Sequence, residues 1–210
     1  MKTKFPREEA LAVVRELLPL LRPCCAPLVP TNPDSGTWFR IAGSLRRDKP
    51  EVGDIEIVYV PAFGEVKDGL FTKTGNLFDA RLEELVLSRV LAMRPNKNGH
   101  FTWGQSNKLA LHVASGIPID FFATTIPCFY NYLVCRTGGK DSNLQIATSA
   151  QQRGLKWHPT HSGFEVTNAA QANHALGRND LTIGRHVVVQ REEDVFQIAG
   201  LPWLEPKDRS

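Results

Sequence analysis

The chain has 210 residues and a mass of 23.4 kDa, a length that suits one domain or two small lobes. Hydrophobic residues make up 42% of it and charged residues 22%, as in ordinary globular proteins, and there is no repeat, low-complexity tract or apolar run long enough to span a bilayer. The formal net charge of +3 is only weakly basic, so overall charge alone selects no partner.

The first part of the chain mixes helical and strand patterns. Pro6, Glu8 and Glu9 are typical of a helix start, and apolar residues follow at helical spacing as far as Leu21. A proline-rich loop comes next. The elements expected after it are a strand near 37–41, a strand at 54–60, a loop at 61–75, a helix at 76–93, and short β runs near 100–103, 107–113 and 117–124.

At Pro127 the pattern changes from short β runs to helical segments, which predicts a second, smaller lobe. We expect a short apolar helix leading to "RTGGKDSN", a helix near 142–153 closed by Gly154, a hairpin-like stretch, and a last helix around 192–199. The predicted class is α+β, with a mixed α/β lobe at 1–126 and a small α+β lobe at 127–210. Between residues 131 and 191 there are seven Lys or Arg against three acids, which suits a polyanionic ligand.

Three acids stand out in the first lobe. Side chains of a strand alternate between faces, so Asp54 and Glu56 point the same way, about 7 Å apart. Two carboxylates this close repel each other unless hard cations lie between them. Asp120 sits in the apolar strand "GIPIDFFATT", where a lone carboxylate needs a reason. If that strand neighbours the first, the three acids form a metal site; the alternative for Asp120 is an edge acid facing water.

A glycine–serine turn precedes the paired acids. Gly43 allows close backbone approach, the Ser44 hydroxyl can donate to phosphate oxygens, and Arg46 and Arg47 bring forked donors. Such turns are common. The order strand, GS, arginines, GD, strand is what favours a triphosphate site.

These residues carry a resemblance to a known family. The stretch "GSLRRDKPEVGDIEIVYV", residues 43–60, resembles the G-S-x-R-R…G-D-x-D motif of the DNA polymerase beta superfamily, in particular its X family of repair polymerases. Further similar blocks follow in family order and extend the resemblance over nearly the whole chain: "FPREEA", "IPID" around Asp120, "RTGGKDSNLQIATSAQQRGL" and "EEDVFQIAGLPWLEPKDRS".

The resemblance implies a polymerase-beta-like palm, a mixed sheet flanked by helices, and a thumb lobe that binds nucleotide and DNA. It leaves no room for an amino-terminal lyase domain. Asp54, Glu56 and Asp120 would be the catalytic acids and would ligate two Mg²⁺ ions, with Mn²⁺ as a substitute. The implied reaction is in-line attack of a primer 3′-hydroxyl on the α-phosphate of a dNTP.

Other positions would bind the nucleotide. Ser44 and Arg47 would hold the β and γ phosphates, and the turn at 137–139 would lie along the sugar. Asn143 would reach the minor-groove edge of the base. The full set that the resemblance implies is Gly43, Ser44, Arg47, Gly53, Thr137, Gly138, Gly139 and Asn143.

The chain departs from the family pattern at several positions. Glu56 stands where the family has aspartate, and Cys135–Arg136 replaces an aromatic pair before the T-G turn. Lys140 replaces an acid near the base, and Pro118 a basic residue that touches primer phosphate. These changes leave fidelity and sugar choice open, because small misplacements are costly in catalysis.

Three functions follow from this pattern. The first is a template-directed DNA polymerase that fills short gaps in repair, acting on gapped or primer–template DNA with dNTP. The second is a nucleotidyltransferase of the same superfamily that acts on RNA, a protein or a small molecule. The third, and least favoured, is a DNA-binding remnant without catalysis.

We expect the protein to be intracellular and not secreted. The four cysteines lack the spacing of a zinc or redox motif, and the start "MKTKFPREEA" lacks the apolar region of a signal peptide. We expect no membrane partner, and a monomer, because periodicity reveals no exposed heptad or large apolar patch.

Overall fold

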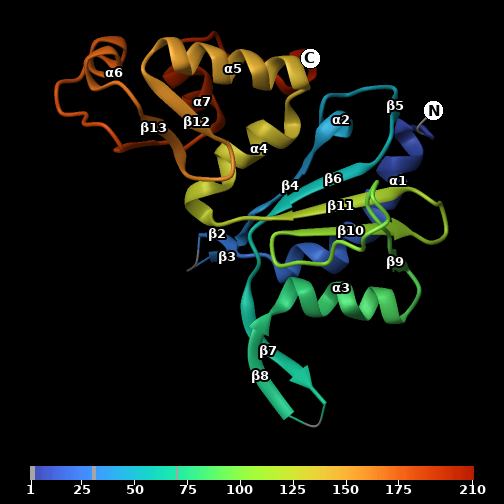
Figure 1. Ribbon diagram of the computed structural model, residues 1–210. Helices are drawn as coiled ribbons and strands as arrows, with labels where there is room; N and C mark the ends of the chain where they lie inside the picture. Colours follow the sequence, from blue (N-terminus) through green and yellow to red (C-terminus); the bar gives the residue numbers. More distant parts are fainter. Residues whose placement is uncertain (1–2, 30–31, 70) are drawn as a thin grey trace. The chain divides into compact units, whose positions relative to one another are not determined.

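The structure is a computed structural model that describes residues 3–29, 32–69 and 71–210. The chain divides into two compact units, Met1–Thr124 and Thr125–Ser210, each described here by itself (Figure 1). Seven α-helices and a mixed sheet are present in the described residues, which confirms the expected α+β class. None of the helices described is both long and apolar enough to cross a membrane.

The first unit is built on a five-stranded sheet. Its strands are, in spatial order, β4 (Phe39–Ala42), β6 (Ile55–Tyr59), β11 (Pro118–Ala123), β10 (Asn107–His112) and β9 (Leu91–Met93). β6 and β11 run parallel, whereas the other neighbouring pairs are antiparallel. The strand of the paired acids thus lies directly beside the strand of Asp120.

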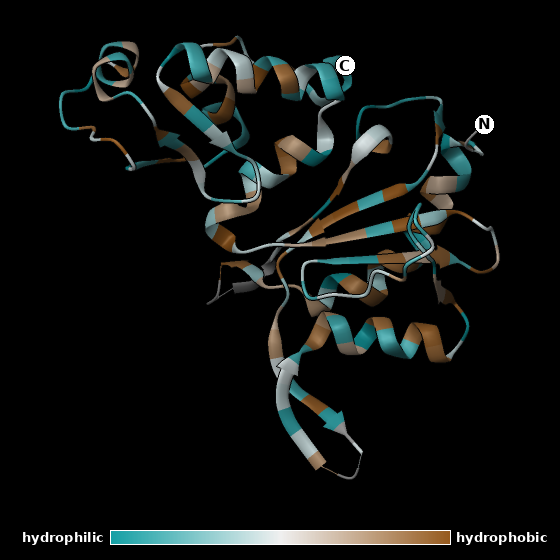
Figure 2. Ribbon diagram, viewed as in Figure 1, coloured by the Kyte–Doolittle hydropathy of each residue, from teal (hydrophilic) through white to brown (hydrophobic). Residues whose placement is uncertain are grey.

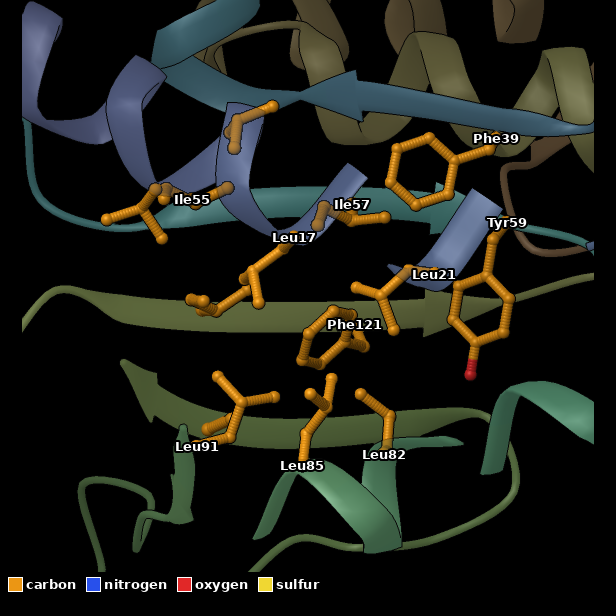
Figure 3. Close-up of a cluster of buried hydrophobic side chains, with 14 of the residues drawn as sticks. Leu17, Leu21, Phe39, Ile55, Ile57, Tyr59, Leu82, Leu85, Leu91 and Phe121 are labelled. Atoms are coloured by element: carbon orange, nitrogen blue, oxygen red, sulfur yellow. The ribbon is translucent and has the colours of Figure 1, made fainter. Parts of the chain in front are cut away.

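Helices α1 (Arg7–Leu21) and α3 (Leu77–Leu87) pack on one face of this sheet through the main core (Figure 3). Leu17 and Leu21 of α1 meet Ile55 and Ile57 of β6, which alternate along the strand with Glu56 and Val58. Figure 2 shows hydrophobic and hydrophilic residues alternating along α3, as expected for a helix with one buried side. The opposite face of the sheet carries Glu56 and Asp120, together with the buried apolar residues Val58 and Phe122.

Smaller elements complete the first unit. They are β1 (Phe5–Pro6) paired with β5 (Glu51–Val52), β2 (Pro27–Val29) paired with β3 (Asn32–Thr37), the 3₁₀ turn η1 (Arg22–Cys24), the short helix α2 (Gly43–Arg46), and the hairpin β7 (Phe63–Asp68) with β8 (Phe71–Asn76). Each of these strand pairs forms a two-stranded sheet of its own.

Three sequence expectations for this unit were wrong. Residues 61–75 are not a loop, because β7 and β8 pair along six positions. The helix expected at 76–93 ends at Leu87, Arg89 has a φ of 60°, and the chain continues into β9. The run at 100–103 makes only isolated bridges, Phe101 with Pro95 and Trp103 with Lys108.

The second unit has a core of its own, enclosed by four helices and a three-stranded sheet. The elements are η2 (Ile126–Cys128), α4 (Phe129–Thr137), α5 (Lys140–Gln152), β12 (Leu155–His158), β13 (Gly163–Val166), α6 (Ala169–Leu176), β14 (His186–Val188), α7 (Glu192–Ala199) and η3 (Pro206–Asp208). Gly154, with a φ of 73°, follows α5 as expected, and α7 spans the expected residues.

Helix α6 was not anticipated. At its start, the Asn168 side chain accepts a hydrogen bond from the Gln171 N–H (3.1 Å), and at its end Gly177 has a φ of 62°. These are ordinary capping signals, so the sequence did contain the information.

Candidate active site

The two strands that carry acids bring Glu56 and Asp120 side by side. In the parallel pairing of β6 with β11, these two residues are register partners. Their neighbours Ile55 and Phe121 face the core, so both carboxylates lie on the opposite face of the sheet. Neighbouring strands are about 4.8 Å apart, which places both carboxylates within reach of one cation. Asp54 comes immediately before β6 and is, like the other two, half-buried.

An arginine that the sequence did not single out contacts this pair. The guanidinium of Arg94, just beyond β9, donates a hydrogen bond to a carboxylate oxygen of Asp120. The backbone N–H of Arg94 donates to the carbonyl of Leu109, the register partner of Asp120 on β10. Arg94 therefore reaches across β10, and both charged side chains are mostly shielded, at 24% and 16% exposed. Charge-assisted contacts of this kind are strong where water is scarce.

The glycine–serine turn lies against Glu56. Gly43 begins α2 with a φ of 62°, and a Cβ atom there would be 2.8 Å from the Oε2 atom of Glu56. Glycine is needed on both counts, for the backbone conformation and for space. The Arg47 N–H donates to the Gly43 carbonyl (3.2 Å), so one short turn carries Gly43, Ser44 and Arg47 together. Gly43, which begins the predicted phosphate-binding turn, thus lies against Glu56, one of the predicted acids.

The acids have the donor chemistry that suits a divalent cation. Carboxylate oxygens are the ligands that Mg²⁺ prefers, and the Glu56–Asp120 pair supplies them on one face. Over the ranges that the structure describes, however, no group of three His, Cys, Asp or Glu side chains converges in a way that could hold a metal ion. The donor chemistry fits, while Arg94 meets one oxygen of Asp120 and the three-acid group stays a prediction.

The other predicted nucleotide residues lie in the second unit. Thr137 ends α4 and is fully buried, and the N–H of Gly138 donates to the carbonyl of Val134 (2.8 Å). Asn143 does not point its amide outward as expected for a base contact. Its Nδ2 donates to the Cys135 carbonyl (2.9 Å), because that carbonyl lies at the open end of α4.

The Asn143 side chain also explains why residue 138 is a glycine. A Cβ atom at Gly138 would lie 2.9 Å from the Oδ1 atom of Asn143, so the turn and the amide are packed together. Gly53, the remaining predicted residue, lies in a bend of the first unit directly before Asp54. Sequence motifs alone cannot show which of these side chains hold the turn and which are turned to solvent.

A second cluster of titratable groups covers the exposed face of the sheet of the second unit. His158 lies 2.8 Å from the Oε2 atom of Glu165, and His186 is the register partner of Glu165 on β14. The hydrogen bond from His158 holds the pKa of the Glu165 carboxyl below its ordinary value, with help from the charges of His158, Lys156 and His186. The imidazoles of His158 and His161 stack in parallel, 5.5 Å apart, rather than converging on a shared point.

Comparison with known proteins bears on both units. A family model described as the DNA polymerase beta thumb matches residues 132–210. The chain is also 27% identical over 216 residues to DNA polymerase lambda of Arabidopsis thaliana, a similarity that covers all of this chain and 37% of the relative. The chain therefore spans little more than a third of that relative. Together, the thumb match and the similarity along the whole chain support a relationship to the X family of DNA polymerases.

Proposed function

We propose that this protein is a small template-directed DNA polymerase that fills short gaps in DNA repair. It would transfer a dNMP unit from a dNTP to the 3′-hydroxyl of a primer. The observation that carries the proposal is the in-register pairing of Glu56 with Asp120 beside the Gly43 turn. Acids and phosphate donors in one place are what phosphoryl transfer requires, since its catalysis is mostly positioning and charge stabilisation.

The first unit would hold the triphosphate and the reacting groups. Asp54, Glu56 and Asp120 would hold two divalent cations, Mg²⁺ with Mn²⁺ as a substitute. When bound, such ions supply Lewis-acid stabilisation of the charge on the phosphates and on the attacking oxygen. The Ser44 hydroxyl would donate to a phosphate oxygen, and the Arg47 guanidinium would pair with two such oxygens.

The bonds in this step balance. A new bond forms between the primer 3′-oxygen and the α-phosphorus, while the bond from that phosphorus to the pyrophosphate oxygen breaks. The 3′-hydroxyl gives its proton to a water molecule, and the leaving pyrophosphate takes the electron pair of the broken bond. Gly43 would let the triphosphate approach the backbone closely, because no side chain stands there.

The second unit would hold the sugar, the base and the duplex. Thr137, Gly138 and Gly139 would lie along the sugar, and Asn143 would face the base once its amide leaves the Cys135 carbonyl. The thumb match supports DNA as the partner. A gapped or primer–template duplex, a monomeric state and an intracellular location belong to the same proposal.

The test is nucleotide incorporation on labelled duplexes with a recessed primer, a one-nucleotide gap or a blunt end, in Mg²⁺ or Mn²⁺. We expect templated extension that is strongest on the gap. Asp54→Asn and Asp120→Asn should each lower the rate about 100-fold or more, the scale for losing a charge-stabilising group. Glu51→Gln, which changes an exposed acid on the adjacent β5, should leave the rate near that of the wild type.

Failure to extend any of the three duplexes with either metal, by protein with native circular dichroism, would contradict the proposal. Transfer of a nucleotide to RNA, a protein or a small molecule under those conditions would favour the second function in its place.

A further inference from the structure

The last residues of the chain contact the predicted sugar-binding turn. The backbone N–H of Ser142 donates to the carbonyl of Ser210 (2.8 Å), and the N–H of Ser210 donates to the Ser142 hydroxyl (3.0 Å). Ser142 is in the first turn of α5, where helix N–H groups have no partner within the helix. Ser210 therefore satisfies the start of α5 from a position 68 residues away in the chain.

Gly139 shows how closely the two segments approach. A Cβ atom there would overlap the backbone carbonyl group of Ser210. The φ of Gly139 is −75°, a value that any residue adopts, so glycine is needed here for space and not for backbone conformation. The Ser210 backbone thus lies directly on the turn that would follow the nucleotide sugar.

Arg209 fixes Ser210 in this position. Its side chain is fully buried; Nη1 donates to Glu192 (3.1 Å) at the start of α7, and Nε donates to the Leu204 carbonyl (3.0 Å). The guanidinium also lies over the rings of Phe196 and Trp203, at 5.1 and 4.8 Å from their centroids. The Arg209 side chain is held in place, because breaking its pair with Glu192 would leave a buried positive charge without that counter-charge.

The turn is also held from its inner side. The Asn143 N–H donates to the Gly139 carbonyl (3.1 Å), while its Nδ2 donates to Cys135. The turn after α4 is therefore contacted by Ser210 on one side and tied to α4 by Asn143 on the other. Their conformation depends on a segment that no sequence motif connects with them.

We propose that Arg209 and Ser210 form a clamp that positions residues 137–143 for the incoming nucleotide. Arg209, Ser210 and Ser142 are thus positioning residues, and their role in nucleotide affinity rests on the polymerase function proposed above. The clamp contributes equally to nucleotide binding in the ground state and in the transition state, so its loss should raise the KM for dNTP and leave kcat nearly unchanged.

The decisive variant is Ser142→Ala, which removes the acceptor of the Ser210 N–H and keeps the backbone. Ser149→Ala is its matched control. Ser149 lies in the same helix, and its hydroxyl donates to the Ala199 carbonyl (2.6 Å) without touching the turn. Ser142→Thr keeps the hydroxyl and serves as the rescue.

Two measurements separate the clamp from the polymerase function. The first is amide hydrogen exchange of residues 137–143 in the protein without nucleotide. We expect it to be about fivefold faster in Ser142→Ala, as for the loss of one hydrogen bond, and unchanged in Ser149→Ala. The second is steady-state incorporation on gapped DNA. The KM for dNTP should rise about fivefold in Ser142→Ala, with kcat within about twofold of the wild type, and Ser142→Thr should restore it.

Equal exchange in Ser142→Ala and wild type would overturn the clamp, as would the same rise in KM in both alanine variants. A wild type that incorporates no nucleotide would contradict the polymerase function alone, since the exchange comparison still decides whether the clamp holds the turn.

Discussion

Arg94 changes the charge balance of the acid pair. Glu56 and Asp120 are neighbours on parallel strands, and two partly shielded carboxylates at this separation repel each other. The positive charge of the Arg94 guanidinium offsets this repulsion without a metal ion. A divalent ion that binds both acids has to compete with Arg94 for Asp120.

Arg94→Ala should lower the free energy of unfolding by about 1–3 kcal/mol in chelator, because the partly shielded Asp120 carboxylate loses its ion pair with Arg94. Added Mn²⁺ should narrow this difference from the wild type, since the freed oxygen becomes available to the ion. Urea unfolding with and without Mn²⁺ measures both effects. Arg81→Ala breaks an exposed pair with Glu84 on α3 and should cost under about 1 kcal/mol in either condition. If the two variants behave alike, Arg94 does not balance these acids.

Gly43 and Glu56 should be energetically coupled. Gly43→Ala places a Cβ atom against the Glu56 carboxylate at a positive φ, so it should destabilise the protein by about 1–3 kcal/mol. In Glu56→Ala the obstructing carboxylate is gone, and the same glycine change should cost at least about 0.5 kcal/mol less. A double-mutant cycle by denaturant unfolding gives the coupling. Additivity of the two changes would mean that the carboxylate moves aside freely.

Glu165 should make stability depend on pH in the acid range. Its pKa is held below the ordinary value of 4.5, chiefly by the hydrogen bond from His158, so its contribution is present above that value and is lost as pH falls through the lower folded pKa. Thermal unfolding from pH 7 to pH 3 should therefore show a steeper loss of Tm in the wild type than in Glu165→Gln. Changing the exposed Glu83 to Gln should leave the dependence of Tm on pH as in the wild type. If Glu165→Gln also leaves it unchanged, the Glu165–His158 hydrogen bond does not contribute to the loss of stability in acid.

At the scale of elements, the periodicity of the sequence predicted the helices and strands whose signals lie in neighbouring residues. Helices α1 and α7 and strand β6 follow from alternation and from capping residues next to them in the chain. The β7–β8 hairpin was missed although "DGLF" contains a common turn dipeptide, since neither strand shows an apolar face. The end of α3 was missed because the positive φ of Arg89 leaves no mark in composition.

The α1 helix offers a direct test of the core. Leu17 is 2% exposed against the central sheet, whereas Leu20 of the same helix is 36% exposed. Leu17→Ala should lower the free energy of unfolding by about 2–5 kcal/mol, and Leu20→Ala by under about 1 kcal/mol. Urea unfolding followed by circular dichroism compares the two. Similar losses of unfolding free energy in the two variants would mean that α1 does not pack on the sheet through Leu17.

At the scale of the whole molecule, sequence and structure contribute different parts of the site. The order of motifs along the chain was enough to indicate the family, and the thumb match and the polymerase lambda similarity support it. From the sequence, Glu56 and Asp120 could be brought together only by assuming that their strands are neighbours, because no local sequence signal fixes the pairing of parallel strands. Arg94 and Ser210 could not be found at all, since each reaches its partner through tertiary packing.

The parallel pairing of β6 with β11 also has a consequence for the order of folding. The chain between these strands contains a hairpin, α3 and two further strands. This whole segment has to close into a loop for Glu56 and Asp120 to become neighbours. Closing so long a segment costs chain entropy before any contact repays it, and contacts of high sequence separation form slowly. We therefore expect the carboxylates of the candidate site to come together late in folding, so that a newly made chain would acquire its local helices before it acquires the candidate site.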